Sequence, residues 1–121
     1  GEYADLVGEN LEDLDVTGDS GLTFTTDQDE RLADWQPDAD GLAPMLLYGS
    51  LEAPDGGVPE GGVVVVNGRV AGVAGDFAED GDHVTFSALI SEEILQRGEN
   101  DVVLLVPRRS GSRQFETATL E

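Results

Sequence analysis

The sequence predicts an all-β fold, an immunoglobulin-like β-sandwich of about seven or eight strands with one short helical turn near residues 91–97. The strongest observation is Asn67-Gly68, which follows four valines and precedes a second apolar segment. A type I′ hairpin turn needs positive φ at both central positions, which Asn tolerates and Gly adopts freely. Residues 63–66 and 101–107 are apolar without alternation, which predicts central strands covered on both faces. Sixteen glycines and five prolines in 121 residues predict many turns.

The chain is expected to divide into an N-terminal arm and a main domain. Residues 1–43 are expected to form an acidic arm with one or two strands, packed on a β-sandwich core of residues 44–121. The composition shifts at residues 36–44, which read as a loop, so this segment is the expected internal boundary.

Within the arm, Leu6, Val7, Leu11 and Leu14 have roughly helical spacing, which predicts one helical turn docked by the leucines. Residues 21–26 alternate and are rich in Thr, which predicts a strand. Residues 27–35 fit either a helical turn or another edge strand, and both alternatives stay open.

The main domain has a more regular pattern. Its expected strands are residues 45–52, 63–66, 69–74, 83–90, 101–107 and 114–120. Gly49 interrupts the first of these, which indicates a bulge or a point of close packing. The segment 53–62 is expected to be a loop and 75–82 an acidic turn. Ser91 is the expected cap of the helical turn at 91–97, and Gly98 its end.

The charge is the most unusual property of the chain. There are 26 acidic residues and six basic ones, all arginine, which gives a formal net charge of −20. Such a surface repels phosphate backbones and anionic membrane surfaces, so nucleic acid and direct membrane insertion are not expected. Either of two conditions explains the acidity. One is a salt-rich medium, where a Debye length of about 3 Å at 1 M screens the repulsion; the other is specific cation binding.

The chain has no cysteine, which excludes disulfides, thiol nucleophiles and Cys-ligated metals. No apolar run approaches the roughly 20 residues that a membrane span needs. The sequence begins with Gly, so we expect it to be part of a larger protein.

Five segments give the chain a resemblance to a known module. They are Leu6-Val7-Gly8 and residues 44–49 (PMLLYG), 64–70 (VVVNGRV), 86–90 (FSALI) and 98–104. Together they resemble the non-catalytic extracytoplasmic β-sandwich module of membrane-anchored sulfatase-like proteins, in the alkaline-phosphatase superfamily that includes lipoteichoic-acid-synthase-type enzymes. The resemblance implies a module outside the membrane, beside the catalytic domain of a larger chain. The nucleophile and metal ligands of that superfamily have no counterpart in this sequence.

Two groups of charged residues are candidate binding sites. Asp76, Glu79, Asp80 and Asp82 offer the oxygen ligands that Ca²⁺ prefers, although their spacing does not fit an EF-hand. The alternative is that they are turn residues on a solvated acidic surface.

The second group is Arg108, Arg109 and Arg113, half of the basic residues, which could bind an anion by bidentate contacts. The alternative is that these arginines pair with the protein's own carboxylates.

Other chemistry has little support. His83 is the only imidazole, and neither Ser87 nor Ser91 has an adjacent base, so no catalytic residue and no cofactor other than calcium is expected. Tyr48, Trp35 and Phe77 would suit a sugar-stacking platform, but with aromatics so scarce we expect Tyr48 and Trp35 to be buried in the core.

The resemblance, together with the absence of a catalytic motif, implies a non-catalytic extracytoplasmic accessory or interaction domain of a larger membrane-associated sulfatase-like protein. Its partner would be the rest of the parent chain or a component of the cell envelope. The alternative is a glycan- or calcium-binding adhesion module on an acidic, salt-adapted surface.

Overall fold

A computed structural model of the chain describes residues 2–37, 44–52 and 58–121, and confirms the all-β prediction. The strands are β1 (Asp15–Thr26), β2 (Met45–Glu52), β3 (Gly62–Val66), β4 (Arg69–Asp80), β5 (His83–Ile90), β6 (Val102–Pro107) and β7 (Gln114–Leu120). A short α-helix, α1 (Asp29–Ala33), and 3₁₀ turns at Ala4–Leu6, Leu11–Asp13 and Glu92–Ile94 accompany them. Much of the expected loops 36–44 and 53–62 lies outside the described residues.

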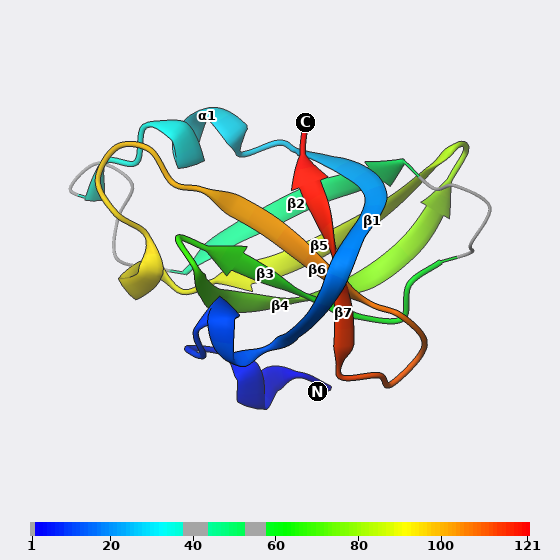
Figure 1. Cartoon of the computed structure of the whole chain (residues 1–121). Helices are drawn as coiled ribbons and strands as arrows, with labels where there is room; N and C mark the ends of the chain where they lie inside the picture. The colour runs from blue at the N-terminus through cyan, green and yellow to red at the C-terminus, as the bar shows by residue number, and fades with distance from the viewer. Residues whose placement is uncertain (1, 38–43, 53–57) are drawn as a thin grey trace.

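The strands close into a barrel and do not divide clearly into the two sheets of a sandwich (Figure 1). The order around the barrel is β1-β2-β5-β4-β3-β6-β7, and β1 then pairs with β7 in parallel. Strand β1 closes the barrel because it is twelve residues long and bends: its register on β7 shifts twice, near Gly18 and Gly21, whose φ angles are 147° and 79°. Its last residues then pair with β2, which gives every strand two neighbours.

This closure changes the expected division at residue 43. Residues 15–26 form a barrel strand, longer than the expected strand at 21–26. The part that packs outside the barrel is the segment of residues 2–14, called the arm below. Its leucines at positions 6, 11 and 14 pack on the barrel as expected, although the arm forms two 3₁₀ turns in place of one helical turn.

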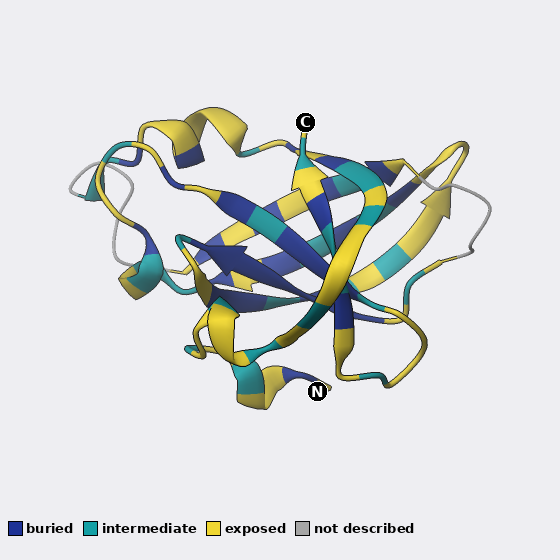
Figure 2. Ribbon diagram, in the orientation of Figure 1, coloured by how far each residue is buried: buried dark blue, intermediate teal, exposed yellow. Residues whose placement is uncertain are grey.

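The barrel has an inner and an outer apolar cluster, which explains the valine run. Val64 and Val66 face the inner cluster, whereas Val63 and Val65 face an outer cluster between the barrel wall and the arm. Tyr3 of the arm is buried in the outer cluster, with its ring 5.4 Å from that of Phe115 in an edge-to-face contact. The prediction that β3 is covered on both faces is therefore confirmed, and Figure 2 shows this strand buried along its length.

The Asn-Gly hairpin is confirmed as well. Asn67 and Gly68 have φ angles of 52° and 79°, as a type I′ turn requires. The Asn67 side chain also donates a hydrogen bond of 2.9 Å to the Oδ1 atom of Asn100 and accepts one of 2.9 Å from the Asp101 amide. It therefore holds the hairpin to the segment before β6, a role that the backbone dihedrals alone do not require.

One end of the barrel is plugged. Leu32 of α1 and Trp35, two residues after this helix ends, belong to the inner cluster. The helical alternative for residues 27–35 is therefore confirmed. Asn100 is buried beside them and donates from Nδ2 to the Leu32 carbonyl oxygen at 3.0 Å. The expected helical turn at 91–97 is shorter, at Glu92–Ile94, and Ser91 is its N-cap residue but caps it through its backbone carbonyl, not through its side chain.

Candidate functional site

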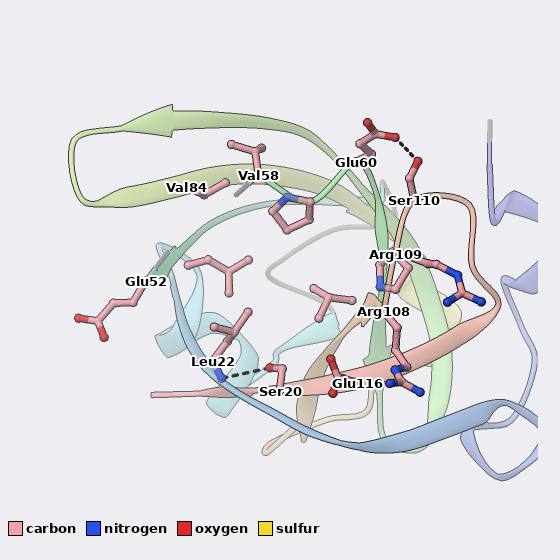
Figure 3. A pocket seen from close by; sticks show the side chains of 14 residues that line it. Ser20, Leu22, Glu52, Val58, Glu60, Val84, Arg108, Arg109, Ser110 and Glu116 are labelled. Atoms are coloured by element: carbon pink, nitrogen blue, oxygen red, sulfur yellow. Dashed lines mark hydrogen bonds between the residues drawn. The ribbon is translucent and has the colours of Figure 1, made fainter. Parts of the chain in front are cut away.

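The other end of the barrel is open and forms a cleft of about 350 Å³ (Figure 3). Its floor consists of inward-facing aliphatic side chains from four strands: Leu22 of β1, Leu51 of β2, Val84 of β5 and Val106 of β6. Inward positions on antiparallel strands alternate with outward ones, so barrel closure brings these four side chains to one mouth. The floor is continuous with the inner cluster, to which all four belong or against which they pack.

The rim of this cleft is charged and polar. Arg108, Arg109 and Ser110 line it from the turn after β6, and Glu116 lies on β7 on the same side of the opening (Figure 3). Within the described part of the chain, the side chains of Arg108 and Arg109 make no hydrogen bond or ion pair. Two guanidinium groups are therefore available at the mouth of an apolar cavity, in a chain dominated by carboxylates.

Two further carboxylates complete the rim, at Glu52 and Glu60. The Oγ atom of Ser110 donates a short hydrogen bond to Glu60, so that carboxylate is engaged. Glu52 lies at the end of β2, opposite His83 in the register of β5, and both line a shallow hollow next to the cleft. His83 is exposed, and no second imidazole exists to form a site with it.

Arg113 does not join the other two arginines. It makes a bidentate pair with Asp5 of the arm, at 3.0 and 3.1 Å, and its guanidinium carbon lies 5.3 Å from the centre of the Tyr3 ring. The hydrogen bonds from Arg113 lower the pKa of the Asp5 carboxyl and those to Asp5 raise the pKa of Arg113. The structure thus shows Arg113 paired with one of the protein's own carboxylates, and this ion pair holds the arm on the barrel.

The four acidic candidates do not gather into a metal site. Strand β4 continues through the expected turn at 75–82 to Asp80, so these residues lie along an exposed hairpin. Asp76 sits at a bulge with a φ of 55° and accepts a hydrogen bond of 3.3 Å from the Ser87 hydroxyl, whereas Asp80 and Asp82 flank Gly81 at the tip. Among the described residues, no three His, Cys, Asp or Glu side chains are close enough together to hold a metal ion.

The three aromatic candidates lie apart. Trp35 is 2% exposed, as expected for a core residue, and the guanidinium of Arg31 lies over its ring at 5.4 Å. Phe77 stacks on Phe86 with ring centres 5.5 Å apart. Tyr48 is 49% exposed on the outer wall, so the expectation of its burial is wrong because its strand turns that face to the surface.

Sequence reasoning missed an apolar patch on the outer wall of β2 and β5. Leu46, Tyr48 and Leu89, called the outer strip below, are 41%, 49% and 62% exposed. Leu46 and Leu89 are direct cross-strand neighbours, and Tyr48 is two residues further along the same face. A hollow beside Tyr48 is flanked by Asp27 and Asp76. The signal was present in residues 45–48, where apolar residues occupy both faces of an alternating strand.

No helix in the described part of the chain has the length and apolar character needed to cross a membrane. A comparison with protein-family models, with curated proteins and with solved structures finds no match to this chain. What the cleft and the outer strip can do is therefore argued from their own residues.

Proposed function

We propose that this chain is a non-catalytic accessory domain that binds a second protein domain through the outer strip. The observation that carries the proposal is the exposure of Leu46, Tyr48 and Leu89, side by side on two paired strands. Single exposed apolar residues are ordinary on a protein surface, whereas contiguous ones mark interaction sites. Large aromatic side chains such as Tyr48 are also typical of the anchors in protein interfaces.

The outer strip continues an interface that already exists within the chain. Val73 of β4 packs in the outer cluster under the arm. It precedes Ala74, which pairs with Ala88, so Val73 lies beside Leu89 on the same barrel wall. The arm therefore covers one part of an apolar wall whose next part is exposed, and a partner domain would extend that cover.

Charge indicates the chemistry of the partner. Asp27 and Asp76 flank the hollow at Tyr48, and the chain as a whole carries 20 excess negative charges. The complementary surface would have an apolar centre with a lysine or arginine beside it, and that cation would contact the Tyr48 ring and a carboxylate.

The resemblance to the module of sulfatase-like proteins supplies a candidate partner. The partner would be the catalytic domain of the same membrane-anchored parent, with the chain outside the cytoplasm. The barrel would then be a closed form of the immunoglobulin-like sandwich of that module.

Binding between this chain and the separately expressed remainder of its parent protein tests the proposal. Leu89→Asp should weaken the affinity, measured by calorimetry, by about tenfold or more, because it places a charge in a desolvated contact. Val7→Asp is the matched control, since Val7 is 43% exposed but lies on the arm, outside the outer strip. Equal affinities of the two variants, or association of Leu46 and Leu89 with a second copy of the chain instead, would refute the proposed docking.

A glycan-binding alternative has one observation in its favour, the half-exposed ring of Tyr48 between two carboxylates. Tyr48→Ala separates the two functions. If the strip binds protein, this variant weakens the domain contact together with Leu89→Asp and the chain gives no signal on a glycan array. Array binding that disappears in Tyr48→Ala and persists in Leu89→Asp would favour the glycan-binding module.

A further inference from the structure

We propose that the open end of the barrel binds a small amphipathic organic anion, with an aliphatic part on the floor of the cleft and a singly charged head group at Arg108 and Arg109. This site lies at the mouth of the barrel, apart from the outer strip on its wall, and the inference does not depend on the docking function. Nothing in the arm, in α1 or in the outer strip contributes to the lining of the cleft.

The cavity has the size and composition of a small-molecule site. Its volume of about 350 Å³ falls within the range that such sites occupy, and barrel mouths are places where they occur. Leu51 and Val84 are 1% exposed and Val106 is 5% exposed, so the floor is made of rigid inner positions of the barrel. Val58 and Pro59 add an apolar wall from the segment before β3 (Figure 3).

The two ends of the barrel differ in a way that favours a ligand at this one. At the opposite end, Leu32, Trp35 and Leu95 fill the barrel and belong to the inner cluster. The described chain places no comparable side chain over Leu22 and Val84, and the cleft is the result. The aliphatic surface still open to water at this end belongs to Leu22, Val58 and Pro59, and covering it with the alkyl part of a ligand is the favourable contribution to binding.

The two arginines at the rim determine which head group the cleft can bind. Arg108 and Arg109 follow one another at the rim, and neither side chain has a hydrogen-bond or ion-pair partner in the described residues. Their neighbour in the same turn, Arg113, has one, because it is bonded to Asp5. A guanidinium group matches a carboxylate or a phosphate ester by parallel N–H···O bonds, so an anion at the rim would supply the partner that the fold leaves out.

The rim carboxylates limit the charge of the ligand. Glu52, Glu60 and Glu116 line the same cleft, so the lining has three acidic residues and two basic ones. Multiply charged anions would be repelled, as would any polyanion, by these groups and by the net charge of the chain. A single negative charge close to the two arginines, with an uncharged alkyl body, satisfies both constraints.

Octanoate is a suitable probe, followed by methyl NMR at fixed molar NaCl. The methyl resonances of Leu22, Val84 and Val106 should shift on titration, and those of Leu46 and Leu89 on the outer strip should not. In the double variant Arg108→Gln/Arg109→Gln the affinity should fall by about tenfold or more. Octanol, which lacks the charge, should bind the double variant and the parent chain equally. Octyl phosphate, which carries nearly two negative charges at neutral pH, should bind more weakly than octanoate, and equal or tighter binding would overturn the restriction to a singly charged head group.

Two matched variants make the experiment decisive. Arg97→Gln also removes a positive charge, but at an exposed position outside the lining of the cleft, and should leave the octanoate affinity unchanged. Glu116→Gln removes a repulsive carboxylate from the rim and should increase it. Unshifted cleft methyls would overturn the proposal. An equal loss of affinity per arginine replaced, at Arg97 and at the rim, would also overturn it, because binding would then depend on the net charge alone. The NMR spectra of the free variants show in the same experiment that each is folded.

Discussion

Replacing Gly49 by alanine tests the inner packing of the barrel. Gly49 lies in the middle of β2, opposite Phe86 of β5. A Cβ atom at this position would fall on the Phe86 ring, 2.6 Å from Cε1 and 2.9 Å from Cε2, with Cζ closer still. These separations are well inside van der Waals contact, so either the ring or the strand must move.

The Phe86 ring has little freedom to move. Phe77 stacks on it with ring centres 5.5 Å apart, and Phe24 packs edge-to-face at 6.0 Å. Overpacking of a tight core costs about 1–3 kcal/mol, and a ring held by two neighbours favours the upper part of that range. We therefore expect Gly49→Ala to lower the free energy of unfolding by about 2–3 kcal/mol.

Gly75→Ala is the matched control. Gly75 is also in a strand, β4, but a Cβ atom there would have no heavy atom of another residue within 4 Å. The same substitution should leave the packing intact and stabilise the fold by about 0.4–1 kcal/mol, because alanine restricts the unfolded chain.

Urea unfolding at fixed molar NaCl measures both variants. Trp35 is the single tryptophan and is 2% exposed in the inner cluster, so its fluorescence reports the loss of that cluster directly. An unchanged m-value would show that the variants differ in stability and not in the unfolded state. If Gly49→Ala is as stable as the parent chain, or if Gly75→Ala loses as much, the close approach of β2 to Phe86 is wrong.

Two further expectations concern the hairpin and the charge. Gly68→Val should cost about 1 kcal/mol or more, because Gly68 has a φ of 79° with open space around it and the cost is backbone strain alone; a variant as stable as the parent would contradict the type I′ turn. The midpoint of thermal unfolding should rise steadily from low salt to molar NaCl, because screening relieves repulsion among 26 acidic residues. A melting temperature insensitive to salt would exclude salt adaptation, and an additional rise with CaCl₂ at matched ionic strength would favour cation binding.

Local patterns predicted most of the strands. Residues 45–52 form β2 with the predicted bounds, and the Asn67-Gly68 turn has the predicted conformation. These features depend on side-chain alternation and on dihedral preferences, which are properties of short segments. The valine run also predicted cover on both faces, although the sequence did not show that the arm supplies the outer cover.

Closure of the barrel could not be predicted in this way. It depends on the parallel pairing of β1 with β7, which begins with Asp15 opposite Gln114. The first part of β1, residues 15–20, is polar and contains glycine, so it resembles a turn. Backbone hydrogen bonds to β7 hold it in the sheet, together with the Thr17 and Ser20 hydroxyls, which donate to β7 carbonyl oxygens, and none of these contacts produces an alternating apolar pattern in the sequence.

The candidate site depends on closure of the barrel. Arg108 and Arg109 could be selected from the sequence because their turn holds half of the basic residues, but their aliphatic floor comes from four separate strands. Only the barrel brings Leu22 and Val84 together, so the pairing of an apolar cavity with a cationic rim was beyond local reasoning.

The arm also explains why the outer strip is exposed. The wall of β3, β4, β6 and β7 is apolar on its outer face, and the arm buries it through Tyr3 and three leucines. Arg113 fastens this cover to the barrel by its pair with Asp5, and the Tyr3 hydroxyl donates to the Ser112 carbonyl oxygen at 2.8 Å.

Around the barrel, β5 and β2 follow β4, and there the described arm makes no cover. Apolar side chains on the outer face of a barrel strand are buried only where another element covers them, as the arm covers Val63 and Val65. Leu46 and Leu89 extend the same wall without such an element. Burial of apolar surface holds the acidic arm against the barrel, and the same requirement favours a partner's surface over β2 and β5. We expect that surface to be basic where the arm is acidic, because Asp27 and Asp76 lie beside it.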